Sequence, residues 1–155
     1  MRGMGGMVVA GARYAEVCPG CGAQGEWSGA QVLLEGDGRL RWDAEFACAA
    51  CGEAMSSCGG EVPPGVRELL LAADGAATVS LPPDTRSPAA MRVLRASLGL
   101  DLASVRPVLE AIRHKTYVCT LPEAELLARQ LREAGVAAVA ERLGDARGDV
   151  RGDVR

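Results

Sequence analysis

The chain has 155 residues, of which 48% are hydrophobic, so it is long enough for one ordinary domain or two small ones with a buried core. Its formal net charge is −3, and this charge is unevenly distributed. Residues 1–62 contain four arginines and eight acidic residues, whereas residues 77–155 contain twelve basic and ten acidic residues. Proteins bind nucleic acid largely by neutralising phosphates with Lys and Arg, so the acidic first part argues against a nucleic-acid partner.

No stretch approaches the roughly 18 apolar residues that a membrane span needs, so we expect no membrane association. Residues 1–12 are rich in glycine, and the apolar patch at 7–10 is shorter than the roughly 7 to 15 apolar residues of a secretion signal. We therefore expect a flexible N-terminus and a cytoplasmic location. Cytosolic thiols stay reduced, so paired cysteines there indicate metal ligands or redox centres rather than disulfides.

Residues 13–62 are predicted to form a first small domain around a β-hairpin. The expected strands are 30–35 and 39–47, joined by a turn at 36–38. Apolar and charged residues alternate along the second strand, which is typical of a half-buried strand. The hairpin places a pair of cysteines at each of its two ends.

Two short motifs, Cys18-Pro-Gly-Cys21-Gly and Cys48-Ala-Ala-Cys51-Gly, flank this hairpin. Two residues between paired cysteines let one tight turn present both thiolates to one ion, and the following glycine supplies a permissive backbone. The spacing between Cys21 and Cys48 exceeds the roughly 15 to 20 residues that are usual in zinc ribbons, and the hairpin accounts for the excess. We therefore predict a zinc ribbon with one structural Zn²⁺ ion bound by Cys18, Cys21, Cys48 and Cys51.

The alternatives to structural zinc are a redox dithiol and catalytic zinc, and the sequence favours neither. A redox dithiol is typically a single motif after a strand of an α/β unit, which neither pair is. Catalytic zinc needs an open coordination position and usually a nearby histidine or carboxylate, and the single histidine, His114, is distant in sequence. Cys58 is either an alternative metal ligand or a free thiol. Cys119 is expected to be a small buried hydrophobic residue.

Residues 63–76 are predicted to be a linker with a short helix at 66–73, and residues 77–143 a second domain. Its expected order is β-α-α-β-α-β, a small sandwich with strands at 78–81, 116–119 and 136–140 and helices on one face. The fold class is therefore α+β. Residues 144–155 repeat Arg-Gly-Asp-Val, and this composition is typical of a disordered tail, with an integrin-like use of Arg-Gly-Asp as the alternative.

Local signals predict where the three helices of the second domain begin. Ser87 is expected to cap the first helix, with Pro88 as its first residue, and Gly99 to end it. Asp101 is expected to cap the second helix, in which Pro107 predicts a kink. Thr120-Leu-Pro-Glu predicts a capping box at the start of the third helix.

Three stretches of the second domain resemble the C-terminal domain of the bacterial ribosomal large-subunit stalk protein, a fold shared with the adaptor of the Clp protease. These stretches are 91–95 with 98–102, 120–125 and 131–136. In that family the first two helices present basic residues to translation factors, and Arg92, Arg95 and Arg106 stand at matching positions. The resemblance implies a protein-binding surface and an association with translation. A cysteine ribbon occupies the place of the family's dimerisation segment, so we expect the same small domain in another use.

The leading interpretation is a non-catalytic zinc-binding protein that acts as an adaptor, with Arg92, Arg95 and Arg106 contacting an acidic protein partner. An ordinary solvated helix face is the alternative for these arginines. A second hypothesis is a zinc-ribbon module associated with nucleic acid or transcription, and the acidic charge argues against it. The third is an enzyme with an unrecognised site. The sequence has no phosphate-binding glycine loop and no Ser-His-Asp set, which leaves a reactive Cys58 as the best residue for it.

Overall fold

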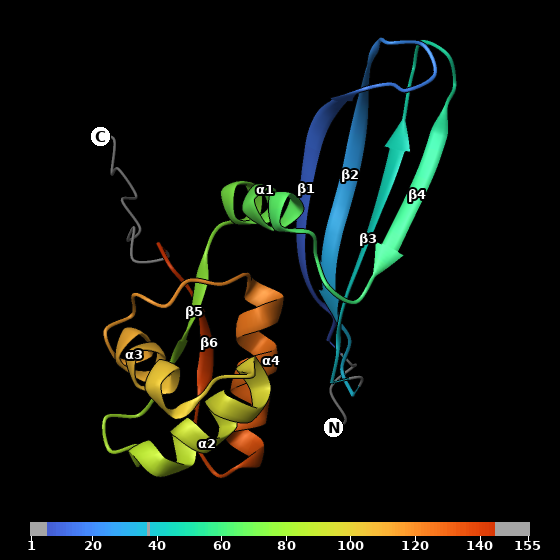
Figure 1. Ribbon diagram of the computed structural model, residues 1–155. Helices are drawn as coiled ribbons and strands as arrows, with labels where there is room; N and C mark the ends of the chain where they lie inside the picture. Colours follow the sequence, from blue (N-terminus) through green and yellow to red (C-terminus); the bar gives the residue numbers. More distant parts are fainter. Residues whose placement is uncertain (1–5, 37, 145–155) are drawn as a thin grey trace, which may run out of the picture.

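The computed structural model describes residues 6–36 and 38–144 as a mixed α/β structure. Within these residues, a four-stranded antiparallel sheet comes first, and helices with a two-stranded sheet follow. Figure 1 shows that the long sheet extends away from the helical part, so the molecule is elongated. The residues of the expected disordered tail after Gly144 lie outside the described part of the chain.

The long sheet is a meander in which each strand pairs with its neighbours in the chain. Its strands are β1 (Val8–Val17), β2 (Gln24–Leu33), β3 (Leu40–Ala47) and β4 (Ala54–Gly59). The register aligns Tyr14 with Trp27 and Trp27 with Phe46, so these aromatic side chains form a row on one face. The β1–β2 and β3–β4 connections lie together at one end of the sheet, the upper end in Figure 1.

The expected hairpin is confirmed as β2 and β3, although β2 begins at Gln24 rather than at residue 30. The expected flexibility of residues 1–12 is wrong from Val8 onwards, because this segment pairs with β2 along its whole length. Strand β4 is not predicted from the sequence either, since its residues are small or polar and mostly exposed. Each cysteine motif therefore connects two paired strands.

Helix α1 (Pro64–Asp74) packs on one face of the long sheet and confirms the predicted linker helix. Its Leu70 is buried with Val62 against Ala10 and Ala12 of β1. The helix begins at Pro64, where the missing N–H lies among the donors that have no partner within a helix. The linker helix and the long sheet thus share a small buried core.

The second part of the chain surrounds a core of its own. Its elements are β5 (Ala77–Ser80), α2 (Ser87–Leu98), α3 (Leu102–Arg113), α4 (Leu121–Glu133) and β6 (Val139–Arg142). The core includes Val79, Leu94, Ile112 and Leu131, all of which are at most 1% exposed. β5 and β6 pair antiparallel.

The predicted helix ends are largely confirmed. The Asp101 carboxylate accepts a hydrogen bond from the Ser104 N–H at 2.7 Å, and Thr120 with Glu123 forms the expected capping box. Gly99 ends α2 with a φ of 64°. The N-cap of α2 is Arg86, without a side-chain cap, so the prediction of Ser87 was wrong by one residue.

The middle strand of the second part is shorter than the sequence predicts. The predicted strand at 116–119 is reduced to one bridge between Ala77 and Cys119, because the N–H groups of Thr116 and Tyr117 bond back to the Ala111 carbonyl of α3. Within its described residues, the second part of the chain therefore has a two-stranded sheet with a bridge rather than the predicted three-stranded one. Helix α3 is continuous through Pro107.

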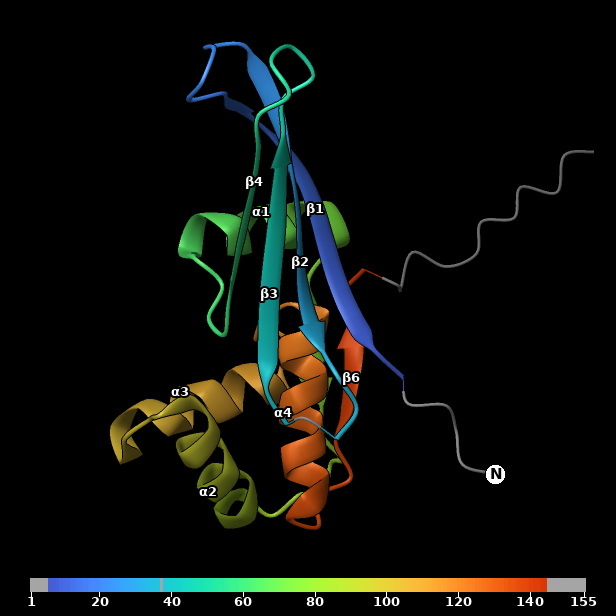
Figure 2. The ribbon, with the colours of Figure 1, turned by 90° about the vertical axis from the view of Figure 1, so that its right-hand side faces the viewer.

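The two parts of the chain contact each other through α4. Figure 2 shows this helix at the lower end of the long sheet, opposite the cysteine turns. The Thr120 hydroxyl donates a hydrogen bond to the side-chain oxygen of Gln31 in β2, and both residues are buried. Arg129 donates to the Leu34 carbonyl at 3.3 Å. Among the described residues, no helix has both the length and the apolar character that crossing a membrane requires.

Candidate metal centre

The two cysteine motifs form matched turns at the same end of the long sheet. In each, the N–H of the first cysteine bonds to a carbonyl five residues on, and the glycine N–H bonds back to that cysteine's carbonyl. These bonds are Cys18 N–H to Ala23 O at 2.7 Å, and Gly22 to Cys18, Cys48 to Glu53 and Gly52 to Cys48, each at 2.9 Å. Gly22 and Gly52 have φ values of 77° and 78°, which explains the glycine that ends both motifs.

These turns bring the four cysteine sulfurs together. Cys18 Sγ lies 3.6 Å from Cys51 Sγ, and Cys21 Sγ lies 3.6 Å from Cys48 Sγ. All four sulfurs lie within 4.8 Å of one another, so they could hold a metal ion. A disulfide needs sulfurs at about 2.05 Å, which excludes both pairs. A tetrahedral ion with bonds of about 2.3 Å places its sulfurs about 3.8 Å apart, close to the observed separation.

Aromatic residues at the end of the sheet pack against the two buried cysteines of the site. Cys18 and Cys48 are 1% and 3% exposed and pack with the buried ring of Phe46, whereas Cys21 and Cys51 are exposed. Trp27 packs against Phe46 at 5.4 Å between ring centroids. One cysteine of each pair is thus buried against the end of the sheet, and the other lies at the surface of the turn.

The thiols of the site influence one another's protonation. Backbone N–H groups, that of Cys51 first and that of Ala50 next, point at the Cys48 sulfur and lower the pKa of Cys48 to about 7. The Glu53 N–H acts on Cys51 in the same direction. Hydrogen bonds with the neighbouring thiols outweigh it and raise the pKa of Cys51 to about 12. Four adjacent thiols cannot all ionise without a cation, because their negative charges would repel one another. A bound cation would favour the thiolate at each position.

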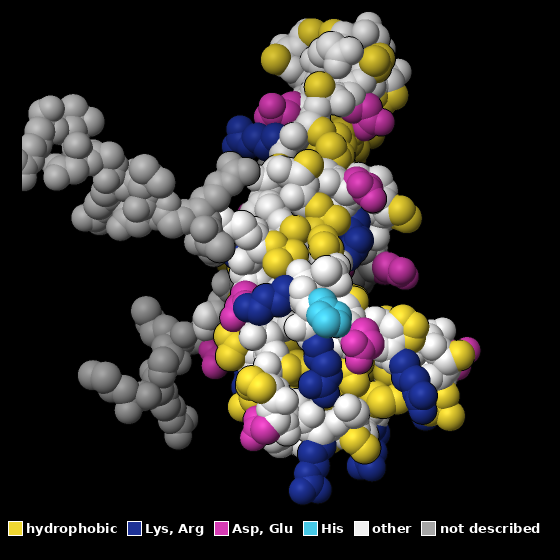
Figure 3. Space-filling model, turned by 90° about the vertical axis from the view of Figure 1, so that its left-hand side faces the viewer, with side chains coloured by type: hydrophobic (Ala, Val, Ile, Leu, Met, Phe, Trp, Pro, Cys, Tyr) yellow, Lys and Arg dark blue, Asp and Glu magenta, His cyan; other side chains and the backbone are white. Residues whose placement is uncertain are grey.

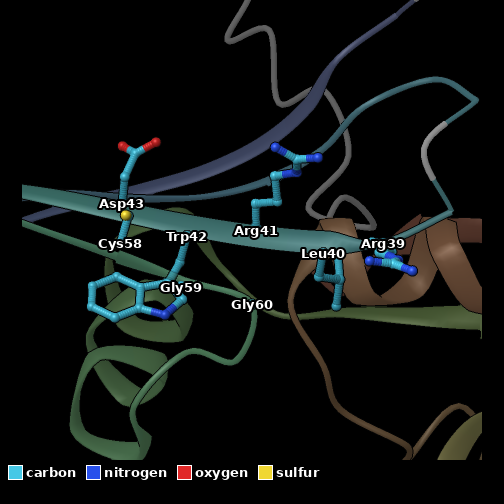
Figure 4. A pocket seen from close by; sticks show the side chains of 8 residues that line it. All are labelled: Arg39, Leu40, Arg41, Trp42, Asp43, Cys58, Gly59 and Gly60. Carbon is cyan, nitrogen blue, oxygen red and sulfur yellow. The ribbon is translucent and has the colours of Figure 1, made fainter.

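Cys58 and Cys119 lie apart from this site. Cys58 is exposed in β4 opposite Asp43 of β3, and it is not one of the sulfurs within 4.8 Å of one another. Figure 4 shows Cys58 and Asp43 in a shallow pocket at the β3–β4 edge, with Trp42 directed to the opposite side of the sheet. Cys119 is 1% exposed, its thiol donates to the Ala77 carbonyl, and burial raises its pKa to about 12.

The predicted partner-binding arginines lie at the helical end of the molecule. Arg92 and Arg95 are exposed one turn apart on α2, and Arg106 is exposed on α3, which packs against α2. Arg106 lines a groove of about 500 Å³ between these helices, together with Met91 and Leu109. Basic side chains are visible at this end in Figure 3.

Comparison of the chain with protein-family models, curated proteins and solved structures found no match. The resemblance of residues 79–142 to the stalk-protein domain has no support from these comparisons and stays a prediction. The assignment of the four-cysteine site does not depend on this resemblance, because it rests on the sulfur separations and the two matched turns.

Proposed function

We propose that this chain is a non-catalytic zinc-binding protein in which one Zn²⁺ ion fastens the end of the long sheet. The observation that carries the proposal is the set of four sulfurs within 4.8 Å of one another on two matched turns. Soft thiolate ligands in tetrahedral geometry favour zinc over the hard cations calcium and magnesium. Four protein ligands complete the coordination shell, so the ion has a structural role.

Zinc binding would contribute directly to folding of this end of the sheet. Binding to a four-ligand site is worth on the order of 10 kcal/mol in small zinc modules. The hydrophobic support around the site is small: Phe46, Trp27, Ala23 and Met55 surround the two buried cysteines. The ion therefore replaces apolar contacts that the narrow end of the sheet cannot provide.

Metal analysis of purified protein tests this proposal. We expect about one zinc per chain by elemental mass spectrometry. Cys21→Ser should lose most of the zinc, since it removes a ligand, and the end of the sheet should lose protection in hydrogen exchange. Cys58→Ser is the matched control and should keep its zinc. Retention of zinc by the first variant, or its loss from the second, would contradict the assigned ligands.

We also propose that the protein acts as an adaptor through the exposed Arg92, Arg95 and Arg106. Neither Arg92 nor Arg106 forms a salt bridge with another described residue, which supports this role. The positive charge of these three exposed side chains is complementary to a protein with an acidic surface, which we propose as the partner.

An affinity pull-down from the native host tests the adaptor role. The variant Arg92→Glu/Arg95→Glu/Arg106→Glu should lose an acidic protein that the wild type retains, because like charges now face each other. Arg13→Glu/Arg39→Glu, which reverses exposed charges in β1 and just before β3, should retain it. Equal recovery by all three proteins would refute the role of the helical arginines.

A further inference from the structure

A second candidate binding site lies where α1 meets the long sheet. This aromatic groove has a volume of about 440 Å³ and is lined chiefly by Tyr14, Glu16, Trp27, Trp42, Val66 and Leu69. Its size falls within the range of roughly 300 to 1,000 Å³ typical of ligand sites. Figure 3 shows hydrophobic side chains gathered on this face of the molecule, with both acidic and basic side chains nearby.

The rings of the groove are held in place by the sheet. Tyr14 and Trp27 are cross-strand partners whose rings lie nearly parallel, at 16° with centroids 6.3 Å apart. The buried Phe46 supports Trp27 from the next strand. Trp42 forms the side of the groove next to α1. The groove is therefore a rigid aromatic surface that needs little ordering before a ligand binds.

One acidic group lies among these rings. Glu16 accepts a hydrogen bond from the Trp27 indole N–H through Oε2, and Oε1 has no protein partner among the described residues. No Lys, Arg or His side chain lines the groove. A carboxylate and three aromatic rings without a cation make a surface that is complementary to a flat cation.

We propose that the aromatic groove binds an arginine side chain from an extended segment of a partner protein. A guanidinium group stacks on aromatic faces and pairs with a carboxylate in the same plane, whereas an ammonium group does only part of this. The negative charge of residues 1–62 favours approach of a basic segment. This site lies on the long sheet and does not rest on the proposed role of the helical arginines.

Other ligands fit the groove less well. A nucleic-acid base would stack on the rings, but its phosphates would meet Glu16 and an acidic domain. A neutral apolar ligand would take the Glu16 carboxylate out of water without a partner, which is costly. Charge and shape together therefore select a cation with a flat face.

The test uses zinc-loaded, ¹⁵N-labelled full-length protein and the peptide acetyl-Gly-Arg-Gly-amide. The chain has two tryptophans, so the indole N–H signals of Trp27 and Trp42 report directly on the groove. Both signals should shift in a saturable way, with a dissociation constant of about a millimolar for so short a peptide. The same peptide with citrulline, which keeps the shape but lacks the charge, should cause no saturable shift.

Matched variants separate the groove from general electrostatics. Glu16→Gln should weaken binding about fivefold or more, because it removes the charged acceptor. Glu45→Gln makes the same charge change at an exposed site of β3 and should leave binding unaltered. Lack of saturable shifts with the arginine peptide, equal binding of the citrulline peptide, equal effects of the two variants, or tighter binding of tetramethylammonium would each overturn the proposal. None of these results would bear on the zinc content or on the helical arginines.

Discussion

At the level of single residues, the packing beneath the four-cysteine site depends on Gly25. A methyl group at this position would overlap the ring of Phe46 and lie 3.1 Å from the Ala47 carbonyl oxygen. Phe46 is 2% exposed and packs with Cys18 and Cys48, so its ring cannot move away without disturbing the cysteines. The identity of this glycine is therefore set by a residue on the neighbouring strand.

Replacement of Gly25 by alanine should accordingly destabilise the protein. We expect the free energy of unfolding to fall by about 1–3 kcal/mol, the usual cost of overpacking a core. Gly29→Ala is the matched control, since a methyl group there would meet the Ala44 side chain at an ordinary 3.6 Å. Urea denaturation of the zinc-loaded proteins measures both changes. Equal stability of the two variants would show that Phe46 can shift freely.

Individual residues differ in how far their roles can be predicted from the sequence. The four cysteines are identified by spacing alone, because each pair lies within one turn. The roles of Gly25 and Gln31 are not predictable in this way, since each depends on a residue of another element, Phe46 and Thr120 respectively. Glu16 was likewise missed as a binding residue, because Tyr14, Trp27 and Trp42 come together around it only through strand register.

At the level of elements, helices were predicted better than strands. The ends of α3 and α4 are set by Asp101 and by Thr120 with Glu123, whose bonds span three residues and can be recognised in the sequence. Strands β1 and β4 lack such local signals. Small residues occupy both faces of β1, and β4 contains little that is apolar, so neither shows a clear alternation. Their pairing is decided by the two cysteine turns and by long-range contacts.

At the level of the whole molecule, a polar network joins the long sheet, the linker helix and the helical part. Arg67 of α1 donates hydrogen bonds to both Glu123 carboxylate oxygens at 2.9 to 3.1 Å, and Glu123 also accepts from the backbone N–H of Thr120. Thr120 in turn bonds to Gln31 of β2. One carboxylate at the start of α4 therefore connects the helical part to the linker helix and to the long sheet.

This connection should make the stability of the protein sensitive to the charge of Glu123. Burial alone would raise the pKa of Glu123, but the hydrogen bonds from Arg67 and Thr120 outweigh it and hold the pKa below its ordinary range. The unfolded chain therefore binds the proton more readily, so the stabilisation is present above the ordinary pKa and is lost as the pH falls through the lowered one. Glu123→Gln retains a residue suited to the capping box but removes the charge, and should cost about 1–2 kcal/mol at neutral pH.

Denaturant unfolding of both zinc-loaded proteins from pH 7 downwards should show this difference in stability shrinking towards acid pH. Both proteins contain the same cysteine site, so its own acid sensitivity cancels in the comparison. A difference that stays constant with pH would mean that Arg67 and Glu123 act through packing and not through their charges.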